Sequence, residues 1–135
     1  MRKLQDILYG VKMLSIEGTT SQLTDHLTFD SRDAKESSVF FAIVGMVSNG
    51  HDYISQVIEA GCKTIIVSEA VETTNSVTII RVEDTNEALA IVAHNFYGEP
   101  SKALKLIGIT GTNGKTTIAT LLYQLFSNLE FQTGL

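Results

Sequence analysis

The sequence predicts an α/β protein with a largely parallel sheet, and two patterns carry that prediction. Short apolar runs rich in β-branched and aromatic residues are typical of buried strands, and they occur at residues 39–44, 64–67 and 77–82. Other stretches repeat apolar residues at helical spacing. Because strands and helices alternate along the chain, we expect crossover connections between parallel strands.

The N-terminal elements follow in order. A short opening helix is expected from the helical spacing of Leu4, Ile7, Leu8 and Val11. Alternating polarity over residues 23–29 predicts a strand, and the apolar run 39–44 predicts a buried strand that ends at Gly45. The next helix ends at Gly61. Its apolar face consists of Ile54, Val57 and Ile58.

The C-terminal elements begin with a helix that Asp84 is expected to cap, with Glu87 three residues later as in a capping box. The apolar stripe of this helix consists of Leu89, Val92, Ala93 and Phe96. Residues 98–101 contain the only proline of the chain and are expected to form a linker. A further strand is predicted at 104–109, and a long helix from Thr116.

These elements divide into two expected domains, residues 1–98 and residues 99–135. The second contains a single predicted strand and a single predicted helix, which cannot build a closed core by themselves. It is therefore expected either to be the truncated start of a larger domain or to pack onto the first domain.

Composition narrows the class of protein. With 10 basic and 15 acidic residues the net charge is −5, which argues against a broad nucleic-acid-binding face. No apolar run is long enough for a membrane span, and the first residues lack a signal-peptide core, so we expect a soluble cytoplasmic protein. The single cysteine, Cys62, is interpreted as a small buried hydrophobe.

A phosphate-binding loop is the strongest functional motif. Residues 110–117 read Thr-Gly-Thr-Asn-Gly-Lys-Thr-Thr, between a predicted strand and a predicted helix. Glycines let successive backbone N–H groups point at phosphate oxygens, and the helix N-terminus favours negative charge. The expected ATP contacts are Gly111, Thr112, Asn113, Gly114, Lys115, Thr116 and Thr117.

Two side chains of this loop have specific expected roles. Lys115 would reach the outer phosphates and is the catalytic candidate, and the Thr116 hydroxyl would ligate Mg²⁺. The loop departs from the general pattern, because Ile109 occupies the place of the first glycine and leaves the shorter Gly-x-x-Gly-Lys-Thr-Thr. A plain strand-to-helix turn that happens to contain a lysine is the alternative interpretation.

The short loop resembles that of the Mur ligase family, ATP-dependent amide ligases that build the peptide stem of bacterial cell-wall precursors. A second stretch agrees, with Asp30-Ser31-Arg32, the apolar run 39–45 and Asn49-Gly50-His51-Asp52 in the family's order. The resemblance covers residues 23–135. It implies an N-terminal UDP-binding domain with a mostly parallel sheet, followed by the first β-α unit of a Rossmann-like ATPase domain.

The resemblance also implies site residues. Uridine contacts fall on Phe29 and Ser31, and contacts to the UDP moiety fall on Met46, Val47 and Ser48. Asn49 stands where the family commonly has an aspartate. His51 is interpreted as capping the helix that follows it rather than touching substrate.

The implied activity is the addition of the third amino acid to UDP-N-acetylmuramoyl-L-alanyl-D-glutamate in peptidoglycan synthesis. The substrate carboxylate attacks the γ-phosphate of ATP, and the incoming amine then attacks the acyl phosphate. The implied partners are these small molecules, ATP and Mg²⁺, with no nucleic acid or membrane and with a monomeric protein. A working site also needs an acidic metal ligand on a neighbouring strand, which cannot be placed in the 18 residues after Thr117, so the 135-residue chain alone is expected to be inactive.

Other readings stay open. One is a sister ligase, either the D-alanyl-D-alanine-adding Mur enzyme or a folate polyglutamylating enzyme, and Asp30-Ser31-Arg32 argues against the folate enzyme. Another is a non-catalytic module that binds a nucleotide sugar and keeps a vestigial loop.

Overall fold

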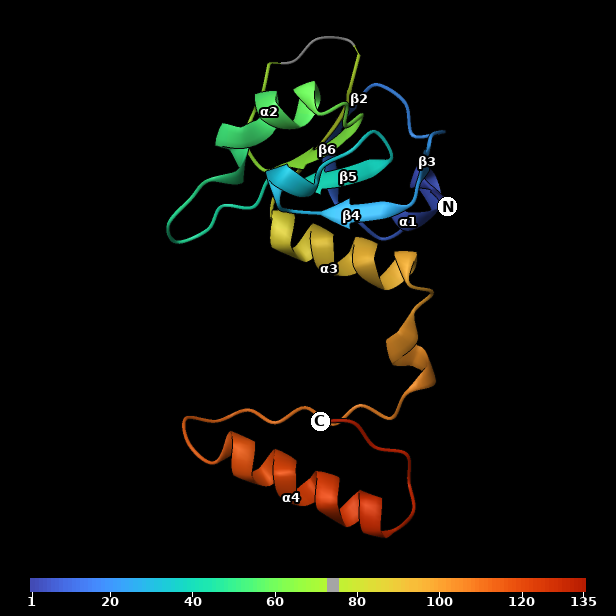
Figure 1. Ribbon diagram of the computed structural model, residues 1–135, viewed down its shortest axis with the longest axis vertical. Helices are drawn as coiled ribbons and strands as arrows, with labels where there is room; N and C mark the ends of the chain where they lie inside the picture. The colour runs from blue at the N-terminus through green and yellow to red at the C-terminus, as the bar shows by residue number, and fades with distance from the viewer. Residues whose placement is uncertain (73–75) are drawn as a thin grey trace. The chain divides into compact units, whose positions relative to one another are not determined.

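A computed structural model describes residues 1–72 and 76–135, which form two compact units, Met1–Pro100 and Ser101–Leu135 (Figure 1). The division falls in the stretch 98–101 that the sequence marks as a linker. Gly98 and Glu99 both take positive φ there, at 78° and 57°, which ends the preceding helix.

The first unit is built on a five-stranded sheet with strand order β2-β7-β6-β5-β4. Its members are β2 (Met13–Glu17), β4 (His26–Thr28), β5 (Ser38–Phe41), β6 (Thr64–Val67) and β7 (Thr78–Val82). The pairs β4–β5, β5–β6 and β6–β7 are parallel, and β2 pairs antiparallel with β7 at one edge. A separate two-stranded sheet joins β1 (Arg2–Lys3) and β3 (Leu23–Thr24). The predicted largely parallel α/β sheet is therefore confirmed.

Helices cover both faces of the sheet, with α3 (Thr85–Phe96) and α2 (Ile54–Glu59) on opposite sides in Figure 1. The alternation of β5 divides its side chains between two cores. Val39 and Phe41 pack with the short helix α1 (Leu4–Ile7) and α3, whereas Phe40 and Ala42 pack with α2. Residues 39–42 are fully buried, as the continuous apolar run predicts.

Local chemistry explains where the helices begin and end. The Asp84 carboxylate accepts hydrogen bonds from the backbone N–H groups of Asn86 at 2.7 Å and Glu87 at 3.4 Å, so it caps α3 as expected. Gly61 ends α2 with a φ of 90°, a conformation that glycine adopts without steric cost.

In the first unit the structure differs from the predicted strands in three places. The expected strand 23–29 is two short strands, β3 and β4, that belong to different sheets. β5 ends at Phe41. The carbonyl of Ile43 accepts the N–H of Gly50 and not that of a neighbouring strand, so the chain leaves the sheet as a loop. β2 was not predicted, because all five of its residues are exposed and their polarity does not alternate clearly.

The second unit contains a 3₁₀ turn (Pro100–Ala103) and the helix α4 (Lys115–Asn128). The strand predicted at residues 104–109 is wrong, since these residues belong to no strand. A strand needs a partner for its backbone N–H and C=O groups, and no other segment of residues 101–135 is a strand. The predicted helix is present and begins at Lys115, one residue before the expected start.

No helix in the described part of the chain combines the length and the apolarity that crossing a membrane requires.

Candidate functional site

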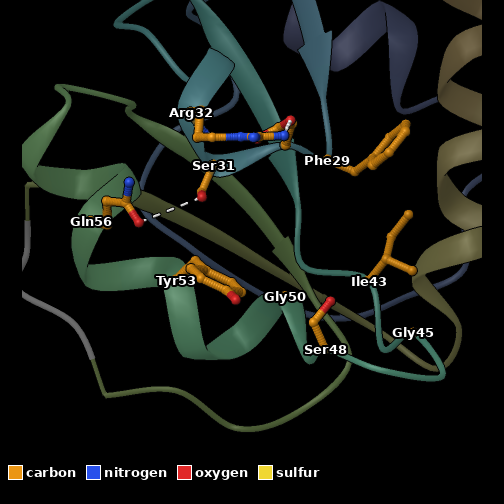
Figure 2. A pocket seen from close by; sticks show the side chains of 10 residues that line it. Phe29, Ser31, Arg32, Ile43, Gly45, Ser48, Gly50, Tyr53 and Gln56 are labelled. Atoms are coloured by element: carbon orange, nitrogen blue, oxygen red, sulfur yellow. Dashed lines mark hydrogen bonds and ion pairs between the residues drawn. The ribbon is translucent and has the colours of Figure 1, made fainter.

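A cleft of about 630 Å³ opens on the first unit where the strands β4 and β5 end (Figure 2). In parallel α/β sheets ligands bind outside the carboxyl ends of the strands, so this is the expected place for a site. Two loops and the start of α2 supply its walls. The lining residues are Phe29, Asp30, Ser31, Arg32, Ile43, Gly45, Ser48, Gly50, Tyr53 and Gln56.

The first wall is the turn that follows β4, with a 3₁₀ turn over Ser31–Asp33. Asp30 caps it, because its Oδ1 accepts the backbone N–H of Arg32 at 3.0 Å. The N–H of Asp30 in turn donates to the hydroxyl of Thr28 at 3.0 Å. These bonds hold the turn rigid and leave Ser31 half-buried, facing the cleft.

The Arg32 guanidinium is fixed by the same aspartate. Nε donates to Oδ1 of Asp30 at 2.9 Å and Nη2 donates to Oδ2 at 2.6 Å, a bidentate pair. These hydrogen bonds lower the pKa of Asp30 from 3.8 to about 2, so the carboxylate is ionised at neutral pH. The arrangement puts a planar cation at the rim of the cleft that can bind an anion or stack on a ring.

The second wall is the loop of residues 43–50, which is closed on itself. The N–H of Gly45 donates to the carbonyl of Ser48 at 2.9 Å, and the N–H of Gly50 donates to the carbonyl of Ile43 at 2.8 Å. Gly50 lies so close to the backbone that follows β5 that a Cβ there would come within 2.6 Å of the Ile43 nitrogen. Only glycine fits this approach, so the Asn49-Gly50 pair is a structural requirement of the loop.

The third wall is the start of α2. Tyr53 and Gln56 line the cleft, and Gln56 reaches toward the first turn, with its Oε1 at 3.5 Å from the hydroxyl of Ser31 (Figure 2). Tyr53 and Gln56 are three apart and therefore share a helix face. Sequence reasoning did not single them out, although their spacing, next to the Asn49-Gly50 motif, was a usable signal.

The residues expected to contact UDP are only partly gathered here. Phe29, Ser31 and Ser48 line the cleft. Met46 and Val47 lie in the same loop but are fully exposed, at 103% and 100%, and do not line the cleft. Asn49 caps the 3₁₀ turn Gly50–Tyr53 with its own side chain, so the expectation that His51 caps the following helix is wrong.

The phosphate-binding loop belongs to the second unit. Gly111 and Gly114 take φ values of 146° and 76°, which favour glycine and turn the chain into the start of α4. The Lys115 ammonium folds over the loop and donates to the carbonyls of Gly111 and Thr112. Residues 111–118 are exposed, so N–H groups, the ammonium and the Thr116 hydroxyl are accessible to a ligand. That donor set fits phosphate oxygens and a hard cation.

Within residues 1–72 and 76–135, no cluster of three histidine, cysteine, aspartate or glutamate side chains could hold a metal ion. Cys62 is 1% exposed, and its thiol donates to the carbonyls of Ser38 and Thr64 at 3.4 Å. Burial raises the pKa of this thiol, which suits the packing role expected for it.

Comparison with known proteins identifies the class. The family model described as "Mur ligase family, catalytic domain" matches residues 24–97, more than half of the chain and wholly within the first unit. The chain belongs to the Mur ligase family.

Curated relatives point to one type within the family. The chain is 44% identical over 135 residues to UDP-N-acetylmuramoyl-L-alanyl-D-glutamate--2,6-diaminopimelate ligase of Cytophaga hutchinsonii. It is 42% identical over 134 residues to the protein of the same name from Phocaeicola vulgatus. Each alignment covers 98% of this chain and 28% of the relative, so the chain spans just over a quarter of the length of these enzymes.

Solved structures agree on the fold. UDP-N-acetylmuramoylalanyl-D-glutamyl-2,6-diaminopimelate--D-alanyl-D-alanyl ligase from Acinetobacter baumannii matches 95% of this chain and 28% of its own, with a TM-score of 0.68 and 26% identity. MurF ligase from Thermotoga maritima in complex with ADP matches 78% of this chain and 24% of its own, with a TM-score of 0.55 and 30% identity.

Proposed function

We propose that this protein takes part in the ATP-dependent addition of 2,6-diaminopimelate to UDP-N-acetylmuramoyl-L-alanyl-D-glutamate, with release of ADP and phosphate. The first unit binds the UDP end of the substrate, and the loop 111–117 binds the phosphates of ATP. The observation that carries the proposal is the cleft at the ends of β4 and β5, where the Asp30–Arg32 turn and the loop 43–50 meet. The names of the relatives support the choice of amino acid.

The cleft suits the UDP end of such a substrate. Phe29 and Tyr53 offer aromatic surface, Ser31 and Gln56 offer hydrogen bonds for a base, and Arg32 offers a cation for the diphosphate. Gripping the substrate far from the reacting carboxylate lets remote binding energy orient that carboxylate. Met46 and Val47 are exposed in the same loop as Ser48 and do not line the cleft, so the contacts expected there would be limited to backbone groups and apolar surface.

The phosphate loop suits ATP. Lys115 would bind the outer phosphates, backbone N–H groups of residues 111–117 would hold the phosphate oxygens, and the Thr116 hydroxyl would ligate Mg²⁺. Mg²⁺ would neutralise charge on the transferring phosphoryl group. The loop supplies binding and charge neutralisation, whereas turnover also requires groups that orient the acceptor and a further acidic metal ligand.

Three further assignments belong to this proposal. The protein acts in the cytoplasm, where its small-molecule substrates are found, and it serves cell-wall synthesis and thereby cell shape and division. It works as a monomer. It does not bind nucleic acid, which the net charge of −5 supports.

A second candidate is the next ligation step, because the solved relatives named above include a D-alanyl-D-alanyl ligase and a MurF ligase. Full-length protein separates the two: the proposed enzyme consumes ATP with the UDP-muramoyl dipeptide and diaminopimelate. The alternative requires the tripeptide substrate and D-alanyl-D-alanine. A non-catalytic binding module would consume ATP with neither.

Calorimetric titration tests the binding roles. UDP-N-acetylmuramoyl-L-alanyl-D-glutamate should bind the chain, and Ser31→Ala should weaken it about 3- to 10-fold, the effect of one hydrogen bond. Ser55→Ala, an exposed serine of α2 outside the cleft, is the matched control and should leave affinity unchanged. Lys115→Ala should abolish ATP binding and spare the UDP-sugar. A folded chain that binds no UDP-sugar would refute the proposed role of the cleft.

A further inference from the structure

His51 is held in one protonation state by its hydrogen bonds. Its side chain is 7% exposed, and Nε2 accepts the backbone N–H of Ser68 at 3.1 Å and that of Glu69 at 3.3 Å. A nitrogen that accepts carries no proton, so the proton lies on Nδ1. Nδ1 donates to Oδ1 of Asn49 at 2.7 Å, which completes a neutral, fully bonded imidazole.

The amide of Asn49 is oriented by the same network. Its Oδ1 also accepts the backbone N–H of His51 at 3.0 Å, and its Nδ2 donates to Oε1 of Glu69 at 3.2 Å. Both amide atoms therefore have partners of the correct polarity. The network links the end of the loop 43–50 to the segment that follows β6.

The hydrogen-bond network of His51 and Asn49 is connected to the cleft through the loop 43–50. Asn49 pairs with Val44 across the loop, and its neighbours Ser48 and Gly50 line the cleft together with Gly45. His51 itself does not line the cleft. Its effect on a ligand can therefore act only through the position of the loop.

We propose that His51 is a positioning residue whose neutral Nδ1–H form holds the loop 43–50 in its ligand-binding shape, so that protonation of His51 weakens binding in the cleft. The inference rests on the proposed binding of the UDP-sugar there. A proton on Nε2 turns the acceptor of two backbone N–H groups into a donor. Both hydrogen bonds then break, and the N–H groups of Ser68 and Glu69 face the N–H group of the ring.

One carboxylate and two backbone N–H groups face the His51 ring. Glu69 is the charged side chain paired with the ring, with Oε1 at 3.9 Å from Nδ1. It attracts an imidazolium, whereas the N–H groups of Ser68 and Glu69 oppose one at Nε2. Asp52 follows His51 in the same turn, and the loop 43–50 contributes no ionisable side chain.

Nuclear magnetic resonance tests the link without any ligand. Long-range ¹H–¹⁵N correlations of the imidazoles should show His51 as the Nδ1–H tautomer at about pH 7.5. On acidification, the amide signals of Ser68 and Glu69 should shift with the same midpoint as the His51 ring. Those of Gly45, Ser48 and Gly50 should follow. A ring that titrates while these amides stay fixed, or an Nε2–H tautomer, would overturn the proposal.

Calorimetry with UDP-N-acetylmuramoyl-L-alanyl-D-glutamate tests whether protonation of His51 weakens binding in the cleft. The ligand is suitable because its carboxylates and diphosphate do not titrate near neutral pH. The Kd should rise about tenfold between about pH 7.5 and pH 5.5 in the unaltered chain. His51→Gln, which keeps an acceptor but cannot titrate, should remove this dependence, whereas His94→Gln on α3 should retain it.

The outcomes separate the two claims. Binding that is unchanged at a pH where the His51 ring is protonated would overturn the positioning role and leave the proposed function intact. An absence of binding at every pH would refute the proposed function instead, and the ligand-free resonance experiment would still decide whether His51 controls the loop.

Discussion

Asp30 holds the guanidinium of Arg32 through both carboxylate oxygens, at 2.9 Å from Nε to Oδ1 and 2.6 Å from Nη2 to Oδ2. The Arg32 side chain is 82% exposed, so the pair contributes little to folding stability. Its effect is to fix the plane of a cation beside Ser31 at the rim of the cleft (Figure 2). Because Asp30 already holds the guanidinium in one orientation, the Arg32 side chain loses less conformational freedom when a ligand binds.

Asp30→Asn should therefore weaken UDP-sugar binding about 3- to 10-fold, because the amide cannot hold the guanidinium by two charge-assisted bonds. Calorimetric titration at low salt measures the effect. Asp33→Asn is the matched control, since Asp33 lies in the same turn but pairs with His26 at 2.7 Å. Equal losses for the two variants would contradict a specific role for the Asp30–Arg32 pair.

Gly50→Ala should destabilise the first unit by about 1–3 kcal/mol, because the new methyl group overlaps the backbone that follows β5. A Cβ at this position would lie 2.6 Å from the Ile43 nitrogen and 2.9 Å from the carbonyl carbon of Ala42. Urea unfolding followed by circular dichroism gives the change in free energy. Gly108→Ala serves as the control, since a Cβ there meets no atom within 4 Å. An unchanged midpoint for Gly50→Ala would show that the loop moves freely.

Acid should weaken the cap of α3. Backbone N–H bonds from Asn86 and Glu87 lower the pKa of Asp84 below its ordinary 3.8. A group whose folded pKa is lowered stabilises the fold above its unfolded pKa, and that contribution is lost as pH falls through the folded value. Urea midpoints should thus fall more steeply between about pH 5 and pH 2 in the unaltered chain than in Asp84→Asn, which caps without titrating. Parallel curves would contradict this.

Cys62 should react with thiol reagents only when the first unit opens. It is 1% exposed and burial raises its pKa, so little thiolate is available in the folded protein. Labelling with Ellman's reagent should be slow in buffer and rapid in urea, and the single cysteine makes the count unambiguous. Rapid labelling of the folded chain would contradict the buried position.

Much of the site could be predicted before the fold was known. Asp30-Ser31-Arg32 and Asn49-Gly50 stood out as motifs, and the structure brings both to the same cleft. The spacing of Tyr53 and Gln56 indicated a shared helix face, but their approach to Ser31 depends on how α2 crosses the sheet. The hydrogen bonds of His51 were equally hidden, since its partners Ser68 and Glu69 lie beyond an intervening helix and strand.

The amino-acid sequence by itself determined the local elements: the buried strands, the capped helix α3, and the glycine-rich turn before α4. Their causes act over a few residues, through apolar periodicity, side-chain capping and glycine at positive φ. Tertiary structure decided the rest. β2 exists because β7 offers an unpaired edge, and residues 104–109 form no strand because no described strand pairs with them. Backbone pairing requires a partner, and a partner is a property of the fold.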